Sequence, residues 1–218
     1  MKFAIKINKP FSFVETMKSH GWFQLPPFYW SEKEQELKWI LRMHDVLRVI
    51  ILQPLKEDES WTWIQCQADD PSTKNIIKQK FHYIMNLHFD LSEFYDLCRQ
   101  DELLQKVPER GLGRIMRNES LFEDVFKSIC ATNVKWNQAV KMVRNIALLG
   151  DVAPGTENHV FPSPQQILDA GEDFLKDNGR VGYRSSYLID LAKRFVEGEP
   201  QAALVEAGEM SAVELKKY

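Results

Sequence analysis

The spacing of apolar residues changes once along this 218-residue chain, near residue 90. Before that point, short runs rich in β-branched and aromatic residues are separated by polar clusters typical of turns, a pattern that favours antiparallel strands. After it, apolar residues recur at helical spacing. Strands followed by helices predict an α+β fold. We therefore expect an antiparallel sheet domain over residues 1–90 and a helical domain over residues 91–218.

The expected strands occupy residues 3–7, 37–43, 46–52, 60–68 and 81–89. The last run alternates most clearly, because every second residue from Phe81 to Phe89 is apolar or aromatic. We expect one face of the sheet to be packed and the other to be wet. Residues 19–30 are dense in aromatic residues and proline but lack helical spacing, which favours a rigid covering loop.

The expected helices occupy residues 91–100, 163–177 and 183–198, together with a pair within residues 120–150. Capping residues mark three helix starts: Ser120 with Glu123, Ser163 with Gln166, and Ser211 with Glu214. The last pair opens a helix that we expect to run through Lys216 and to stop at Tyr218 without a cap.

The pair of helices within residues 120–150 is unusual in its charge. Residues 125–150 include Lys127, Lys135, Lys141 and Arg144 and contain no acidic residue, although the whole chain has a formal charge of -3. Such a basic hairpin with a polar break at residues 131–134 suits a phosphate backbone, because cations neutralise phosphates and the N–H groups at a helix start point toward anions. The structural alternative is a buried hairpin with a solvated basic face.

Composition restricts the remaining function classes. A net negative chain is not a general polycation, so contacts to nucleic acid must come from a local patch. Three widely separated cysteines support neither a disulfide framework nor a metal site, and they fit a reducing cytoplasm. The chain begins without the apolar run of a signal peptide, and no later stretch is long enough to span a membrane. We expect a cytoplasmic monomer that uses no metal or cofactor.

Four motifs, in this order, resemble those of the helix-hairpin-helix DNA glycosylases, in the branch of the 8-oxoguanine and 3-methyladenine DNA glycosylases. They are SLFEDVFKSICATN, VKWNQAVKMV, FPSPQQILDAG and GYRSSYLIDLAKRF. The earlier segments SHGWFQLPPFYW and FDLSEFYDLC resemble a prokaryotic subgroup whose N-terminal sheet is similar to one repeat of the TATA-binding-protein fold. The resemblance implies a base-excision-repair enzyme of the prokaryotic nucleoid.

Enzymes of this family flip a damaged base out of double-stranded DNA and hydrolyse its N-glycosylic bond, so the resemblance implies a plug and a wedge for the vacated space. Asn133 matches the family position whose amide fills that space and hydrogen-bonds the orphaned base. Its structural alternative is to cap the helix that begins near Val134. Tyr183 and Arg184 match the wedging ring and the arginine that contacts the orphaned base. Tyr183 could instead be a core aromatic at a helix start.

The remaining expected DNA contacts lie after Asn133. Gln138 stands where guanine-oxidation enzymes often place an arginine that reads the opposite cytosine, and this departure leaves specificity for 8-oxoguanine open. Lys135, Lys141 and Arg144 are expected to contact phosphates. If the resemblance holds, Asn133 and Arg184 should converge on one surface.

The family's glycine-rich catalytic hairpin and the aspartate that follows it would lie beyond Tyr218. Residues 111–113, Gly-Leu-Gly, come too early and are interpreted as a turn. We therefore expect a helical domain that is incomplete at its C-terminus and a 218-residue chain that is itself inactive. The alternative is a non-catalytic DNA-binding or interaction module that uses the same basic hairpin, and a third interpretation is a helical scaffold without a nucleic-acid role.

Overall fold

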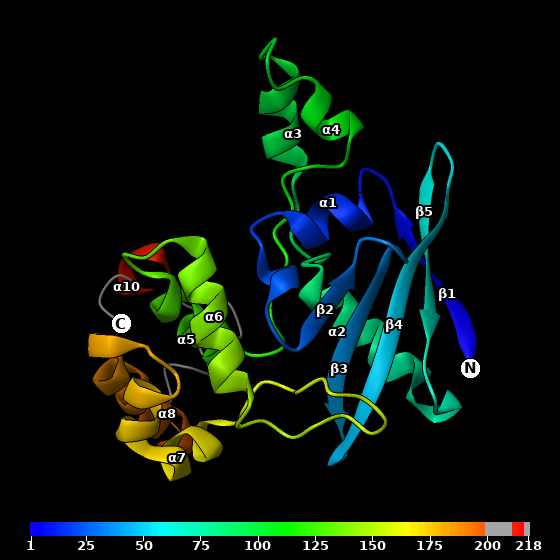
Figure 1. Cartoon of the computed structure of the whole chain (residues 1–218). Coiled ribbons are helices and arrows are strands. Elements are labelled where there is room, and N and C mark those ends of the chain that lie inside the picture. The colour runs from blue at the N-terminus through cyan, green and yellow to red at the C-terminus, as the bar shows by residue number, and fades with distance from the viewer. Residues whose placement is uncertain (199–210, 216–218) are drawn as a thin grey trace. The chain divides into compact units, whose positions relative to one another are not determined.

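The computed structural model describes residues 1–198 and 211–215, and contacts divide the chain into two compact units (Figure 1). Unit 1 comprises Met1–Glu119 and Val152–Asn158. Unit 2 comprises Ser120–Asp151 and the described residues from His159 onward. The contacts therefore place residues 91–119 with the sheet, whereas the sequence predicted a division at residue 90. Within the described ranges, every helix is too short or too polar to span a lipid bilayer.

Unit 1 is built on a five-stranded antiparallel sheet with strand order β1-β5-β4-β3-β2. The strands are β1 (Lys2–Asn8), β2 (Phe28–Ser31), β3 (Glu36–Met43), β4 (Val46–Glu57) and β5 (Trp61–Gln67). This confirms the predicted α+β fold and four of the five predicted strands. Strand β2 was missed, because its four residues are too few to show alternation and the first three lie within the segment expected to be a loop.

The predicted strand over residues 81–89 is wrong, because most of this segment belongs to helix α2 (Lys74–Ile84) and the turn that follows it. The buried residues of α2 are Ile77, Phe81 and Ile84, which follow a helical rather than an alternating period. They join the core on the inner face of the sheet. Phe89, which alternation had assigned to the packed face, is exposed.

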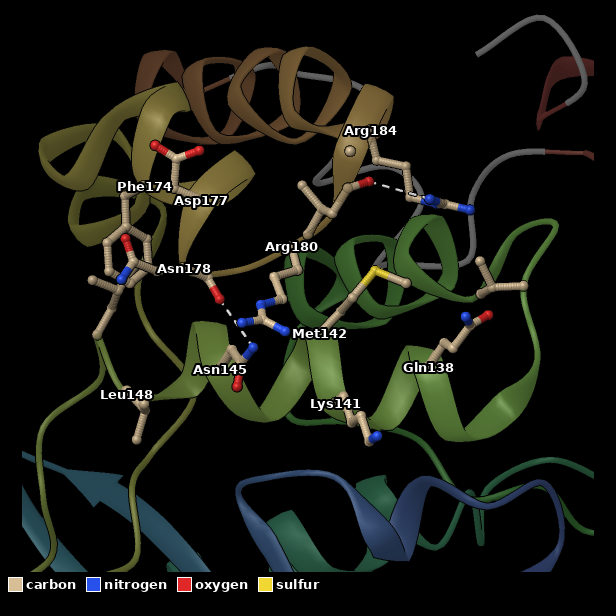
Figure 2. A pocket seen from close by; sticks show the side chains of 14 residues that line it. Gln138, Lys141, Met142, Asn145, Leu148, Phe174, Asp177, Asn178, Arg180 and Arg184 are labelled. Carbon is tan, nitrogen blue, oxygen red and sulfur yellow. Dashed lines mark hydrogen bonds between the residues drawn. The ribbon is translucent and has the colours of Figure 1, made fainter.

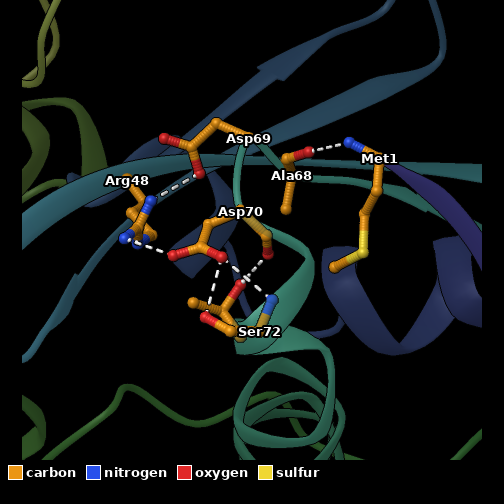
Figure 3. Close-up of polar contacts among 7 residues, drawn as sticks. Met1, Arg48, Ala68, Asp69, Asp70 and Ser72 are labelled. Atoms are coloured by element: carbon orange, nitrogen blue, oxygen red, sulfur yellow. Dashed lines mark hydrogen bonds and ion pairs between the residues drawn. The ribbon is translucent and has the colours of Figure 1, made fainter.

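The corner between β5 and α2 explains where the helix begins (Figure 3). The Asp70 carboxylate accepts from the backbone N–H of Ser72 at 2.9 Å, one residue into the 3-10 turn η2 (Pro71–Thr73) that leads into α2. From β4, Arg48 donates to Asp69 at 2.9 Å and to Asp70 at 2.8 Å. This Asp-Pro start signal precedes the helix and fixes its first turn to the sheet.

Four short helical elements complete unit 1: α1 (Phe13–Lys18), η1 (Trp22–Gln24), α3 (Ser92–Arg99) and α4 (Lys106–Glu109). The expected helix over residues 91–100 is confirmed as α3. Gly111 follows α4 with φ of 62°, and an added Cβ would lie 2.7 Å from the backbone of Phe11. The segment 111–113 is therefore tight connecting backbone in unit 1, consistent with its interpretation as a turn.

Unit 2 contains α5 (Leu121–Ala131), α6 (Trp136–Ala147), α7 (Pro164–Asp177), η3 (Gly182–Arg184) and α8 (Ser185–Glu197). The predicted caps are present: Ser120 accepts from the N–H of Glu123, and Ser163 and Gln166 form a reciprocal capping box. Gly171, with φ of 78°, interrupts α7, so the predicted single helix is kinked. Rings of four phenylalanines form an aromatic cluster at the centre of the unit: Phe122, Phe126, Phe161 and Phe195.

The last described element is α10 (Ala212–Leu215). Its start carries the predicted capping pair, since Ser211 Oγ accepts from the N–H of Glu214 and the Glu214 carboxylate accepts from the N–H of Ser211. The predicted continuation through Lys216 to Tyr218 lies outside the described residues.

Candidate nucleic-acid interface

The turn between α5 and α6 presents Asn133 in a left-handed conformation. Thr132 ends α5 with extended backbone, and Asn133 follows with φ of 51°. Asparagine adopts this conformation more readily than most residues. Lys135, not Asn133, is the N-cap residue of α6, and no side chain caps that helix. The structural alternative of Asn133 as a helix cap is therefore wrong, and its exposed amide serves another contact.

That contact is with Tyr183, fifty positions later in the sequence. A hydrogen bond with the Asn133 side chain is the main reason that the pKa of the Tyr183 phenol is lowered. Tyr183 is 61% exposed, so its interpretation as a core aromatic is wrong. The structure thus brings two sequence-predicted site residues together at the surface of unit 2.

Arg184 departs from its expected role, because only 5% of its surface is exposed. Its guanidinium donates to the backbone oxygen of Thr132, to Thr132 Oγ1 at 3.4 Å and to the backbone oxygen of Val181 at 3.2 Å. It also lies 4.6 Å from the centre of the Tyr183 ring. Arg184 and Asn133 therefore converge, but the expected exposed base contact by Arg184 is corrected to a positioning role. The arginine satisfies the orphaned carbonyl at the end of α5.

Helix α6 exposes the predicted polar residues Gln138, Lys141 and Arg144, and its N-cap residue Lys135 is also exposed. Its first turn contains no acidic residue. Lys127, which the sequence counted with these cations, lies instead in the core of unit 2. Its side chain is fully buried and paired with Glu123, and burial lowers the pKa of its ammonium group. The basic surface of the hairpin consequently lies on α6 and the turn before it.

A cavity of about 780 Å³ lies between α6 and the segment that joins α7 to η3 (Figure 2). Gln138 and Lys141 line it from α6, whereas Lys135 and Arg144 do not. Asn145 Nδ2 donates to the backbone oxygen of Asn178 at 2.9 Å and ties the two walls together. Amide, cationic and apolar side chains, together with the Asp177 carboxylate, thus line one open space, which suits a planar group with hydrogen-bonding edges.

Arg180 is the cationic lining residue that the sequence did not predict. Its side chain reaches the cavity from the segment after α7, and its φ of 57° is uncommon for a residue other than glycine. The pattern Asn178-Gly179-Arg180, directly after a helix, is a turn signal that could have drawn attention to it.

The part of the chain that the structure describes contains no group of three metal-binding side chains. Cys66, Cys98 and Cys130 are buried thiols. Desolvation raises the pKa of both Cys66 and Cys130 to about 12, so neither is an activated nucleophile.

Comparisons with known proteins bear on both units. The sequence family described as 8-oxoguanine DNA glycosylase, N-terminal domain, matches residues 5–123. A probable N-glycosylase/DNA lyase of Methanothermobacter thermautotrophicus is 27% identical over 206 residues, covering 84% of this chain and 64% of the relative. The chain therefore spans less than two thirds of the length of that relative.

Two solved structures are similar in fold. The 3-methyladenine DNA-glycosylase from Archaeoglobus fulgidus has a TM-score of 0.71 at 19% identity, over 93% of this chain and 69% of that one. The apo form of the Clostridium acetobutylicum 8-oxoguanine glycosylase/lyase has a TM-score of 0.68 at 18% identity, over 94% and 69% of the two chains.

Proposed function

The chain belongs to the family of the 8-oxoguanine DNA glycosylase N-terminal domain, within the helix-hairpin-helix glycosylases, and we propose that its unit 2 engages double-stranded DNA containing a damaged base. The whole protein would then remove that base by hydrolysing its N-glycosylic bond. Within this chain we assign residues that contact DNA, and we assign none that cleaves the glycosylic bond. We further propose that the protein acts as a monomer at the nucleoid of a prokaryotic cytoplasm.

The observation that carries the proposal is that Asn133 and Tyr183 are exposed on one surface of unit 2. Arg184 joins their positions, because it donates to the carbonyl of Thr132, the residue before Asn133, and lies 4.6 Å from the centre of the Tyr183 ring. A flipped base leaves a gap in the duplex, and the gap must be filled by a protein group that also satisfies the orphaned partner base. The Asn133 amide offers donors and an acceptor for that base, while the Tyr183 ring can wedge between neighbouring bases. The left-handed turn projects the amide, and buried Arg184 holds the turn by its Thr132 carbonyl.

Phosphate contacts are assigned to the exposed cations of α6 and the turn before it, Lys135, Lys141 and Arg144. The start of α6 adds backbone N–H groups and the positive end of the helix dipole, with no acidic side chain in its first turn to oppose an anion. Gln138, beside Lys141 at the cavity, is placed to meet a base edge rather than a phosphate.

Binding of duplex DNA measured by fluorescence anisotropy tests the proposal. The duplexes would carry 8-oxoguanine, a stable abasic analogue or no lesion, and binding would be followed across a salt series. Replacing Lys135, Lys141 and Arg144 together with glutamine should weaken binding to all three duplexes and lower the salt slope by about 2 to 3, since each phosphate contact contributes about 0.9. The matched control replaces Lys33, Lys106 and Lys193 with glutamine.

The plug and wedge are tested on the abasic duplex. Asn133→Ala and Tyr183→Ala should remove most of the preference for that duplex over undamaged DNA, whereas Tyr183→Phe keeps the ring and should retain it. Equal preference in all three variants and the parent chain would overturn this assignment. If the control variant of Lys33, Lys106 and Lys193 weakens binding as much as the variant of Lys135, Lys141 and Arg144, the basic surface is wrongly placed.

A further inference from the structure

The outer face of the sheet in unit 1 carries a group of tryptophans and lysines that the proposed function does not use. The inner face holds alternate buried residues such as Ile5 and Ile64, so their sequence neighbours Lys6 and Trp63 face outward. These two residues are cross-strand partners between β1 and β5, and Lys56 of β4 is the partner of Trp63 on its other side. Trp61, two residues before Trp63, lies on the same face.

The four side chains, Lys6, Lys56, Trp61 and Trp63, form what we call the tryptophan-lysine ladder. Lys6 Nζ lies 3.5 Å from the centre of the Trp61 ring and 5.3 Å from that of Trp63. Lys56 Nζ lies 4.4 Å from the Trp63 ring. The rings are half-buried and the two lysines are exposed, so ammonium groups rest on aromatic faces that solvent can reach.

The residues around the ladder favour a polyanion. Next along the same face come Ala4, Gln53 and Gln65, and then Lys2, Gln67 and Lys38, as the register shows. Glu36 is the acidic residue on this face of the five strands, and Gln53 donates to it at 3.3 Å. Acidic residues Glu57, Asp58 and Glu59 at the tip of the β4–β5 hairpin mark where this surface ends.

We propose that the tryptophan-lysine ladder binds single-stranded nucleic acid. On binding, the ammonium groups of Lys6 and Lys56 leave the ring faces for phosphates, and bases stack on the faces of Trp61 and Trp63 that are thereby uncovered. Alternating aromatic platforms and cations are the chemistry of single-strand recognition. Residues two apart on one strand are about 6.7 Å apart, twice the step of about 3.4 Å between stacked bases of one duplex strand. Both rings can therefore take successive bases only from an unstacked strand. This inference concerns unit 1 and does not depend on the proposed function of unit 2.

A cavity of about 560 Å³ continues the surface beside β1 and is lined by both Lys6 and Trp61. Lys9, Arg114 and Asp90 also line it, and Lys9 Nζ pairs with the Glu57 carboxylate at 3.1 Å. Arg114 donates to the backbone oxygen of Phe89 at 2.9 Å, while its Nε is buried without a hydrogen-bond partner among the described residues. Because these charges already have partners within unit 1, the phosphate contacts are assigned to Lys6 and Lys56 of the ladder and not to this cavity.

Anisotropy of a fluorescein-labelled oligothymidylate with the full chain at low salt tests this proposal. Each of Trp61→Ala and Trp63→Ala should weaken binding about tenfold or more, and each Trp→Phe variant should weaken it less, because stacking persists. Lys6→Gln with Lys56→Gln should reduce the salt slope by about 1.4, whereas Lys33→Gln with Lys106→Gln should leave it unchanged. Circular dichroism checks that each variant folds.

A different ligand of the tryptophan-lysine ladder would give different results in this experiment. Equal binding by the parent chain and by the lysine pair variant would overturn the proposal, as would a duplex that competes as well as the single strand. If a tryptophan variant fails to fold, quenching of parent tryptophan fluorescence by oligothymidylate, reduced in the lysine pair variant, decides the matter. The α6 triple variant of Lys135, Lys141 and Arg144 should bind oligothymidylate normally, so failure of one surface is distinguishable from failure of the other.

Discussion

Replacing Arg184 with alanine should destabilise unit 2 through the turn that carries Asn133. The side chain is 5% exposed and donates three hydrogen bonds, two of them to Thr132. Hydrogen bonds from a charged group contribute about 1.5–3 kcal/mol each, and the cost of burying the cation offsets part of that sum. We therefore expect Arg184→Ala to lower the free energy of unfolding by about 3 kcal/mol.

Arg184→Lys keeps the charge but loses the planar guanidinium that bonds to both Thr132 and Val181. We therefore expect it to lower the free energy of unfolding by about 2 kcal/mol. Urea unfolding followed by circular dichroism at 222 nm measures both values. Amide hydrogen exchange adds a local readout, because loosening of the turn should speed exchange of the Thr132 N–H, which donates to the Ile129 carbonyl at 3.2 Å, more than exchange in α2, which lies in unit 1.

Arg180→Ala is the matched control, since Arg180 is an exposed arginine only four positions earlier. It should change the free energy of unfolding by less than about 0.5 kcal/mol. If Arg184→Ala is no more costly than Arg180→Ala, or leaves exchange of the Thr132 N–H unchanged, the buried arginine does not hold the turn and the reasoning fails.

Three further predictions concern groups already described. Lys127→Ala should cost about 3–5 kcal/mol of unfolding free energy because it strands the buried Glu123 carboxylate, whereas replacing both partners, Lys127→Met with Glu123→Leu, should be neutral or stabilising, as urea unfolding will show. Burial raises the pKa of Cys66 and Cys130 to about 12 from an ordinary 9.0, so the unfolded thiols ionise first. Stability should be unaffected by these thiols below about pH 8.5 and fall above it by up to about 1.4 kcal/mol per pH unit for each, and replacing both with alanine should flatten the decline seen in urea titrations at pH 8, 9 and 10. Gly150→Ala should lower the thermal midpoint of unit 2, because the added Cβ would lie 1.9 Å from the backbone oxygen of Val160; an unchanged midpoint would contradict this close approach.

Local signals predicted the helical unit well. Ser120 and Ser163 begin helices where their capping pairs indicated, because a cap bonds to backbone only three residues away. The same locality explains the failure at Phe81. An apolar residue at every second position fits a strand, but three helical positions, Ile77, Phe81 and Ile84, hold the buried contacts, and the sheet that they pack against is assembled from distant segments.

The orientation of site residues was less accessible to sequence reasoning. Tyr183 and Arg184 are neighbours in one motif, yet the first is exposed and the second is buried. The difference arises from hydrogen bonds to Thr132, fifty-two positions away, which no local pattern encodes. Arg180 was missed for the same reason, because its place at the cavity depends on how the segment after α7 packs beside α6.

The family assignment and the candidate DNA-binding site rest on different parts of the chain. The family match covers residues 5–123, which lie almost wholly in unit 1, whereas the four motifs that resemble glycosylases begin at Ser120 and lie in unit 2. A match to the sheet unit therefore owes nothing to Asn133, Tyr183 or the cations of α6. It follows that the two conclusions can fail separately. Unchanged abasic-duplex binding by Asn133→Ala would remove the plug and leave the family intact, whereas loss of binding would give the plug support that the family match cannot supply.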